Sequence, residues 1–250
     1  MALLRALSDV ERETGEGLGV MQLSARTGRD KSQVSRALHA LEKVGFVERD
    51  AVTLRYRLGY GLFVLATRGI DRTLITVAAP FLADLAGEVG ETAHLCTLAG
   101  VGVLTLESVA PPDHTFRAAG WVGQTVPAQQ CAVGRVLLGD ATRDFVFHRF
   151  ATTRFRSDAP SDLISSVRDF WTEIERARDL GYATEDEELE ADLVGAAAPI
   201  RNEHGRIVGA LCVSAPKGRQ GTHLEALGRA TRASAVGVSR ALGWTDPTGD

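Results

Sequence analysis

Residues 19–50 constrain the fold most, because they carry the pattern of two short helices joined by a tight turn. Val20–Thr27 has helical apolar spacing and is followed by Gly28, a residue that commonly ends a helix. Asp30 then stands where a helix N-cap is expected, and the helix that it begins stops before Gly45. The stretch therefore predicts a helix-turn-helix.

The second of these helices has two distinct faces. At 100° per residue its apolar side chains fall in one sector and are predicted to be core, namely Val34, Ala37, Leu38, Leu41 and Val44. Short polar and basic side chains lie on the other side or flank the first turn. Because such side chains suit base edges in the major groove, we predict that the base-reading residues are Ser32, Gln33, Ser35, Arg36 and His39.

Two short strands are predicted after this helix, over Phe46–Arg49 and Leu54–Leu58. In the second strand Leu54, Tyr56 and Leu58 alternate with two arginines, so one face is expected to be buried and the other basic. The pattern is that of a winged helix-turn-helix. Its predicted phosphate contacts are Lys31, Arg49, Arg55 and Arg57.

The charge distribution agrees with a local anionic partner. The chain has a net charge of −4, yet residues 26–57 contain eight basic and four acidic side chains. A basic region on an acidic protein is typical of nucleic-acid binding. A solvated charged face with no partner is the alternative, so charge alone does not decide between them.

The composition is that of a soluble globular protein, and the length is enough for one large domain or two small ones. The chain has 250 residues, of which 44% are hydrophobic, and no apolar run is long enough to cross a membrane. The first residues lack the layout of a signal peptide. Cys96, Cys131 and Cys212 are odd in number and widely spaced, which favours reduced thiols. We therefore expect a cytoplasmic protein with no membrane partner.

We expect three parts along the chain: a DNA-binding domain over 1–60, a linker helix over 61–79 that breaks near Pro80, and a second domain over 80–250. The second domain alternates strands and helices. Antiparallel hairpins with helices between them predict an α+β fold built on one sheet. The expected strands are 92–98, 103–109, 193–201 and 206–215, and the expected helices are 130–138, 141–150, 162–179 and 222–242.

The second domain carries no recognised catalytic or nucleotide-binding motif. Cys131 begins a predicted helix, where a thiolate is favoured, and His94 or His114 could pair with it, but a small buried thiol is the preferred interpretation. His94 and Cys96 share a strand face, yet two ligands are too few for a metal site. We therefore predict no catalytic residue, no metal and no cofactor. The acidic run 185–188 is interpreted as a loop, either solvated or beside a pocket.

Small residues gather at three places and suggest a ligand pocket. Residues 130–134 begin a helix without bulk, so free backbone N–H groups there could receive a carboxylate. The strands around 195–198 and 209–214 are also small, and Ser214 can donate a hydrogen bond. Close packing of helices on the sheet is the alternative reason for small residues. Phe116 and Trp121 either cap this pocket or lie at a subunit interface.

These residues resemble the IclR family of bacterial transcriptional regulators. The matching stretches are TGRDKSQVSRALHALEKVGFVERD, RYRLG, GETAHL, LESV, VPAQQCAVGRVLL and the long segment 178–216. The resemblance implies a winged helix-turn-helix, a linker helix and a GAF-like effector-binding domain with an antiparallel sheet. It also implies a homodimer or a dimer of dimers that binds a palindromic operator in double-stranded DNA. Such a protein controls catabolic genes in response to a small organic acid, and we expect this control to be repression. Family members are not enzymes.

Carried onto this chain, the family's ligand contacts are the backbone N–H groups of Ala132 and Val133 and the residues Glu185, Gly195, Cys212 and Ser214. Several of these positions depart from the polar residues that suit very small keto acids. We therefore expect a larger or less polar acid, such as an aromatic one. The alternatives are a GAF-like sensor that binds no DNA and an enzyme that uses Cys131.

Overall fold

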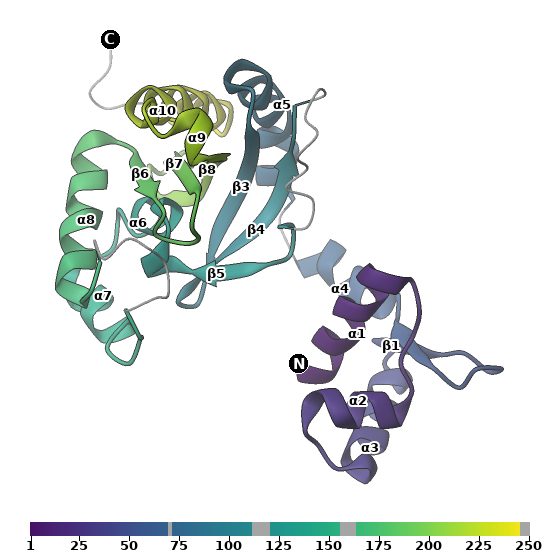
Figure 1. Ribbon diagram of the computed structural model, residues 1–250. Coiled ribbons are helices and arrows are strands. Elements are labelled where there is room, and N and C mark those ends of the chain that lie inside the picture. The colour runs from purple at the N-terminus through teal and green to yellow at the C-terminus, as the bar shows by residue number, and fades with distance from the viewer. Residues whose placement is uncertain (70–71, 112–120, 156–163, 246–250) are drawn as a thin grey trace. The chain divides into compact units, whose positions relative to one another are not determined.

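The computed structural model describes residues 1–250 except 70–71, 112–120, 156–163 and 246–250 (Figure 1). The chain divides into two compact units, Met1–Arg72 and Thr73–Asp250. The linker assigned from the sequence to 61–79 covers α4 of the first unit and the beginning of α5 in the second.

The first unit is a winged helix-turn-helix. Its elements are α1 (Ala2–Thr14), α2 (Val20–Thr27), α3 (Lys31–Lys43), β1 (Val47–Arg49), β2 (Tyr56–Leu58) and α4 (Gly61–Gly69). Leu7, Leu23 and Leu38 are buried together at its centre. Gly28 ends α2 with φ of 65°, and the Asp30 side chain caps α3 by accepting the Ser32 N–H at 2.7 Å. The predicted turn between the two helices is confirmed.

Two apolar residues of this unit are not where the sequence pattern predicted. Val44 is 58% exposed because α3 ends at Lys43 and the chain turns away at Gly45, where φ is 72°. Leu54 is 53% exposed with φ of 57°. The Asp50 carboxylate accepts N–H groups from the turn, including that of Thr53 at 2.6 Å. This turn delays the second strand until Tyr56.

The second unit is built on a six-stranded antiparallel sheet with the strand order β5-β4-β3-β8-β7-β6. The strands are β3 (Thr92–Ala99), β4 (Gly102–Val109), β5 (Thr125–Pro127), β6 (Ala183–Asp186), β7 (Leu193–Arg201) and β8 (Ile207–Pro216). The helices are α5 (Thr73–Val89), the 3₁₀ turn η1 (Ala128–Gln130), α6 (Ala132–Leu137), α7 (Arg143–Arg149), α8 (Val167–Leu180), α9 (Lys217–Gln220) and α10 (Leu224–Ala241). The predicted α+β class is confirmed, and the two short edge strands β5 and β6 were not foreseen.

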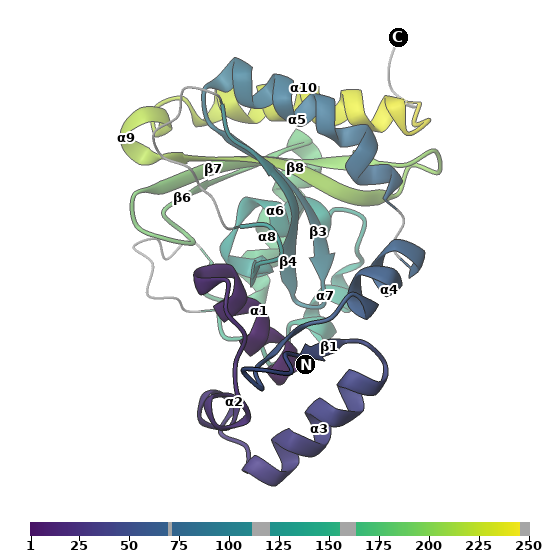
Figure 2. The same ribbon diagram turned by 90° about the vertical axis from the view of Figure 1, so that its right-hand side faces the viewer.

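Helices cover both faces of this sheet (Figure 2). On one face α5 and α10 bury Leu82 and Val238 against side chains such as Leu95 of β3 and Leu211 of β8. On the other face α6, α7 and α8 enclose a separate core that contains Cys96 and Cys212 from the same two strands. Because strand side chains alternate, β3 and β8 contribute to both cores.

The helix α5 passes through Pro80 without dividing there. The predicted break near Ala79 and Pro80 is therefore wrong, because α4 ends at Gly69 and α5 begins at Thr73. A proline inside a helix removes one backbone hydrogen bond. Burial of Ala78 and Leu82 on either side of Pro80 holds α5 against the sheet and offsets that loss.

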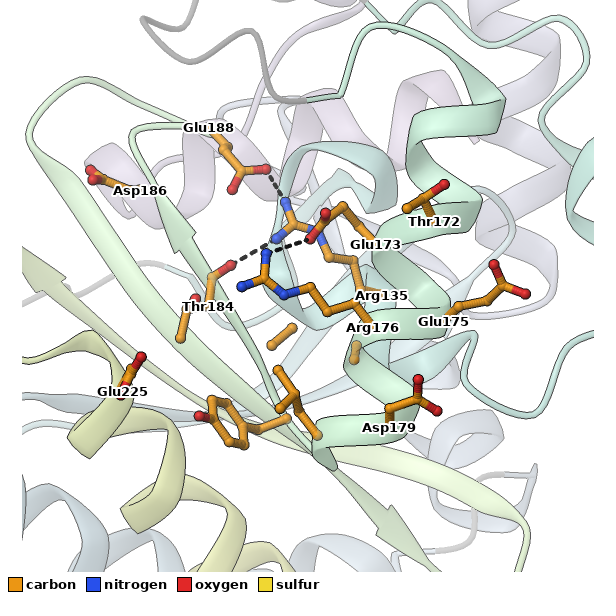
Figure 3. A pocket seen from close by; sticks show the side chains of 14 residues that line it. Arg135, Thr172, Glu173, Glu175, Arg176, Asp179, Thr184, Asp186, Glu188 and Glu225 are labelled. Atoms are coloured by element: carbon orange, nitrogen blue, oxygen red, sulfur yellow. Dashed lines mark hydrogen bonds and ion pairs between the residues drawn. The ribbon is translucent and has the colours of Figure 1, made fainter.

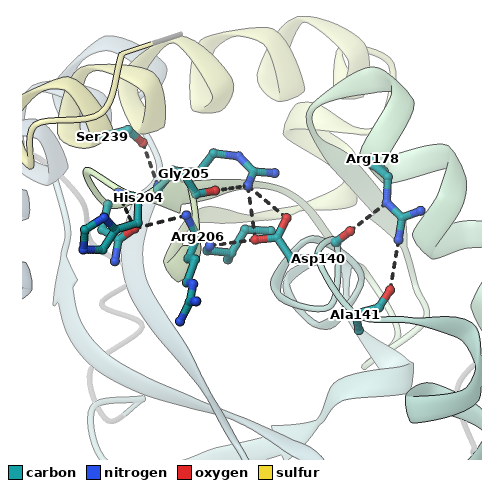
Figure 4. Close-up of polar contacts among 11 residues, drawn as sticks. Asp140, Ala141, Arg178, His204, Gly205, Arg206 and Ser239 are labelled. Carbon is teal, nitrogen blue, oxygen red and sulfur yellow. Dashed lines mark hydrogen bonds and ion pairs between the residues drawn. The ribbon is translucent and has the colours of Figure 1, made fainter. Parts of the chain in front are cut away.

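A polar network anchors the loop that follows α6 (Figure 4). The Asp140 carboxylate accepts hydrogen bonds from the Arg201 guanidinium at 2.9 Å and from the Ile207 N–H at 2.9 Å. Arg178 of α8 donates to the carbonyls of Gly139 and Ala141 at 2.7 and 3.2 Å. These contacts fix the end of α6 between α8 and the β7–β8 turn, which holds the helix in place over the sheet.

Candidate DNA interface and effector pocket

The exposed face of α3 carries all five residues predicted to read bases. Ser32, Gln33, Ser35, Arg36 and His39 are exposed, whereas Val34 and Leu38 on the opposite face are fully buried. The Arg36 side chain lies back along the helix, with its Nε donating to the Ser32 carbonyl at 3.4 Å. This long, exposed contact leaves most of the guanidinium free to swing toward another acceptor.

The wing arginines differ in their surroundings. Arg57 is exposed, and Arg49 lies over the Tyr56 ring at 5.4 Å. Arg55 is only half-exposed and forms an ion pair with Glu16. The sequence pattern treats Arg55 and Arg57 as equivalent, but the structure places Arg55 in an ion pair with Glu16, whereas Arg57 acts on the Asp50 carboxylate by its charge alone.

A small cavity lies between α6 and the middle of the sheet in the second unit. Its volume is about 30 Å³, which is room for roughly one water molecule. Its lining comes from β3, β4, β5, β6, β8, α6 and the connecting segments around them. The lining residues are His94, Cys96, Val103, Thr105, Trp121, Val126, Cys131, Val133, Glu185, Leu189, Cys212 and Ser214.

Glu185 occupies the position where the sequence predicted a ligand carboxylate. It lies on β6, and its Oε2 accepts the backbone N–H of Ala132 at 2.5 Å. Burial raises the pKa of the Glu185 carboxyl, although the Ala132 hydrogen bond and the charge of Arg135 oppose that rise. The predicted anion-binding N–H is therefore satisfied by the protein's own side chain.

Gly195 makes room for this side chain. It pairs directly with Glu185 across β6 and β7, and a Cβ at Gly195 would lie 2.9 Å from the Glu185 Oε1. The glycine thus explains how the carboxyl folds back under the sheet. Neither Gly195 nor Ala132 is among the residues that line the cavity itself, whereas Val133, Glu185, Cys212 and Ser214 are.

The acidic run 185–188 is not a solvated loop. Of the two interpretations given from the sequence, a solvated loop or a loop beside a pocket, the first is therefore wrong. Glu185 and Glu188 are both 6% exposed, while Asp186 points to solvent. Arg135 of α6 ion-pairs with Glu188 and donates to the Thr184 carbonyl at 2.7 Å (Figure 3). These contacts tie α6 to β6, so the run belongs to the wall between the cavity and the outside.

A larger hollow of about 780 Å³ lies on the outer side of Arg135, between α8 and β6 (Figure 3). Arg135 and Arg176 are its basic residues. Its acidic residues are Glu173, Glu175, Asp179, Asp186, Glu188 and Glu225. The excess of carboxylates makes this hollow a poor site for an organic anion, in spite of its size.

His94 and Trp121 form the part of the cavity wall away from α6. Burial lowers the pKa of His94 to about 4, so the ring is neutral near pH 7. Its Nδ1 lies 2.8 Å from the Ser108 Oγ, and the Trp121 ring meets it edge-on with 6.4 Å between centroids. Trp121 therefore lies at the pocket. Phe116, which was weighed for the same place, lies outside the described residues.

The cysteine chemistry differs from the nucleophile considered from the sequence. Burial raises the pKa of the Cys131 thiol, and its Sγ donates to the Pro127 carbonyl at 3.6 Å. A thiolate is therefore disfavoured, which argues against the enzymatic alternative. His114, its other candidate partner, lies outside the described residues. Within the described ranges, no group of three His, Cys, Asp or Glu side chains is placed to hold a metal ion.

Several lining residues were not singled out from the sequence. Val103 and Thr105 come from β4, Val126 from β5, and Leu189 from the segment after β6. The alternation of Val103 and Thr105 on one strand was a usable signal. The short edge strands gave none, because their lengths are too small for a period to be recognised.

Comparison with known proteins gives consistent matches for both units. The C-terminal model of the bacterial transcriptional regulator IclR matches residues 70–240, and the IclR helix-turn-helix model matches residues 1–51. The chain is 32% identical over 246 residues to the glycerol operon regulatory protein of Streptomyces coelicolor, covering 97% of this chain and 94% of that protein.

Two solved structures extend the match to three dimensions. The IclR transcriptional regulator from Alicyclobacillus acidocaldarius is 26% identical, with a TM-score of 0.77 and 97% of each chain covered. An IclR homologue from Microbacterium hydrocarbonoxydans, solved with 4-hydroxybenzoate, is 24% identical with a TM-score of 0.78, covering 96% of this chain and 98% of that one. The second likeness shows a shared fold.

Among the described residues, no helix is both long and apolar enough to span a membrane.

Proposed function

The chain belongs to the IclR family of bacterial transcriptional regulators, and we propose that it binds a palindromic operator through α3 and the wing and releases it when a small organic acid enters the cavity beneath α6. In this proposal it represses catabolic genes. It acts as a homodimer or a dimer of dimers, because a palindrome presents two equivalent half-sites to two copies of α3.

The observation that carries the DNA-binding part is the two-sided character of α3. Five short or basic side chains are exposed along one face, and the apolar face is buried against α2 and the wing. We assign Ser32, Gln33, Ser35, Arg36 and His39 to base edges, with Arg36 to guanine as the strongest contact. Phosphate contacts are assigned to Lys31, Arg49, Arg55 and Arg57.

The effector part rests on the cavity beneath α6. It has an apolar lining with a few polar groups, including Ser214 and Thr105, as small-molecule sites usually have. We assign the effector contacts to Ala132, Val133, Glu185, Gly195, Cys212 and Ser214, and we add Trp121 and His94. The 4-hydroxybenzoate complex of a neighbour supports an aromatic acid as one candidate. The glycerol operon regulator supports a small hydroxylated compound as a second.

An effector must enlarge this cavity, because about 30 Å³ is too little for any such compound. The effector therefore binds a second arrangement of the pocket better than the one described. A ligand shifts a protein between two arrangements only by the difference in its affinity for them. In the proposed mechanism, the expanded arrangement is the one that holds DNA less well.

The test is fluorescence anisotropy of the full chain on DNA from upstream of its own gene and of the neighbouring genes. We expect saturable binding to one palindromic segment, with affinity that falls as salt rises. Addition of 4-hydroxybenzoate or glycerol is then screened for release. Failure to bind any of these segments would favour a sensor that does not contact DNA, while binding without release by any small compound would remove the effector role.

A further inference from the structure

A buried carboxylate already occupies the effector pocket. The Glu185 Oε2 accepts the Ala132 N–H at 2.5 Å, and the missing side chain of Gly195 leaves space for the Oε1. Glu185 also lines the cavity. An organic acid that reached for the same N–H would bring a second carboxylate next to this one. Two ionised carboxylates at one buried site cost free energy, because each negative charge disfavours the other.

The surroundings of Glu185 offer little to offset a second negative charge. Arg135 of α6 is the cation that acts on Glu185, but its guanidinium is already engaged by Glu188 and by the Thr184 carbonyl. His94 on β3 is neutral because burial lowers its pKa to about 4. The same lining contains three buried thiols, Cys96, Cys131 and Cys212, which bring no positive charge to the cavity. Within the described lining, no further basic side chain faces the cavity.

We propose that Glu185 determines the specificity of the pocket by accepting an O–H from the effector, so that the effector enters without adding a net negative charge. The proposal rests on the function proposed above and narrows its ligand class. Ser214 and Thr105, which line the same cavity, supply further hydroxyl partners. A ligand that carries an O–H and some apolar surface against Trp121 fits this lining.

Two kinds of compound carry the required O–H. An alcohol such as glycerol brings it directly and exchanges no proton with water. An organic acid that is ionised in solution must take up one proton from the buffer, so that it shares a single proton with Glu185 once bound. No bond other than this O–H bond is made or broken. The two sources therefore differ in how their binding depends on pH.

Calorimetry of the full chain from pH 6 to 8.5 tests the proposal with glycerol and with benzoate, an aromatic acid that has no O–H other than that of its own carboxyl group. For benzoate we expect the Kd to rise by about tenfold per pH unit in the range where free Glu185 is ionised, because one proton is taken up. For glycerol we expect no dependence on pH. At pH values where free Glu185 is ionised, titration in two buffers with different ionisation enthalpies should count about one proton taken up with the acid and none with the alcohol.

Substitution isolates the role of Glu185. Glu185→Gln keeps the shape and the acceptor for the Ala132 N–H, so it should make acid binding independent of pH and tighter at pH 8.5. The same substitution should weaken the binding of glycerol about tenfold, because a charge-assisted hydrogen bond becomes a neutral one. Asp186→Asn removes the same charge from the next residue of β6, which is exposed and outside the cavity lining, and should leave both profiles unchanged.

The outcomes of these experiments distinguish a failure of the role of Glu185 from a failure of the proposed effector site. Binding of benzoate with a flat pH profile, unaltered in Glu185→Gln, overturns the role of Glu185 and leaves the regulator function standing. Binding of neither compound, in a protein that still binds operator DNA, overturns the pocket as an effector site together with this inference. A thermal melt confirms in each case that the variant is folded.

Discussion

Arg135 of α6 and Glu188, which follows β6, form an ion pair that is almost fully buried, with 1% and 7% of their side chains exposed. The pair joins the helix above the cavity to the strand that carries Glu185. Among the described residues the Nε of Arg135 has no hydrogen-bond partner, and the guanidinium makes its hydrogen bonds to Glu188 and to the Thr184 carbonyl.

Removing one partner of this pair should be costly. Glu188→Gln removes the ion-pair partner of the buried Arg135 cation and leaves only the weaker influence of Glu185 and Glu173 on it, so we expect the free energy of unfolding to fall by about 3–5 kcal/mol. Urea unfolding followed by tryptophan fluorescence measures it well, because Trp121, Trp171 and Trp244 all belong to the second unit. Glu190→Gln, at an exposed position two residues on, is the control and should change stability by less than about 0.5 kcal/mol. Equal effects of the two substitutions would contradict this.

Gly134 of α6 should not tolerate a side chain. A Cβ there would lie 1.9 Å from the Ala128 carbonyl oxygen, so Gly134→Ala must push α6 away from η1. We expect a loss of about 1–3 kcal/mol in the free energy of unfolding. Gly87→Ala in α5 is the matched control, since its Cβ meets nothing within 4 Å, and it should be neutral or stabilising by up to about 1 kcal/mol. A stable Gly134→Ala protein would show that η1 and α6 are less tightly packed than described.

The stability of the second unit should depend on pH through His94. The unfolded chain binds a proton on this ring near pH 6.5, whereas burial lowers the folded pKa to about 4. Between these values the unfolded state holds more protons, so stability falls as the pH is lowered from 6.5 to 4, by about 3 kcal/mol from this group. His94→Gln should flatten that part of the profile. The informative quantity is the wild-type minus variant difference, because carboxylates titrate in both proteins.

Arg36→Ala should relax operator recognition at one base position, at a cost of about 1–3 kcal/mol there. Binding to a panel of operators mutated one base pair at a time measures this. Lys43→Ala, an exposed basic residue near the end of α3, serves as the control and should preserve the order of preference among operators. If Arg36→Ala instead weakens every operator equally, the side chain contacts phosphate and reads no base.

The two wing arginines should differ in their contribution to phosphate binding. Arg57→Ala is expected to reduce the salt dependence of DNA binding by about one ion, whereas Arg55→Ala should reduce it less, since Arg55 is paired with Glu16 in the free protein. Glu16→Gln releases Arg55 and should strengthen binding at low salt. A larger effect of Arg55→Ala than of Arg57→Ala would mean that the Glu16 pair opens on DNA.

The helix-turn-helix could be predicted because its information is local. The periodicity of α3 alone separates Leu38 from Arg36, and Asp30 and Gly28 mark the ends of the helices. Leu54 was misplaced because the Asp50 carboxylate holds a turn that alternation of apolar residues cannot reveal. Local sequence patterns report periodicity well and side-chain hydrogen bonds in turns poorly.

The pocket could be predicted only in part, because its decisive contact is not local. Residues 130–134 and Ser214 were recognised by their small size and their place in the predicted elements. Glu185 pairs with Ala132, which lies 53 residues earlier, and β6 is too short and too acidic to look like a buried strand. Only the assembled sheet shows that this carboxyl points inward.

Side chains of β3 point alternately to the two faces of the sheet, so the two cores of the second unit are separated only by the thickness of one strand. His94 and Cys96 line the cavity, while Ala93 and Leu95 pack in the core beneath α5. In the proposed mechanism, an effector that widens the cavity displaces β3, whose other face supports α5, the helix that follows α4 in the chain. We expect the signal to cross the sheet by this route, so a change in the size of Leu95 should shift the balance between the two arrangements and alter both the effector concentration needed for DNA release and the affinity for DNA alone.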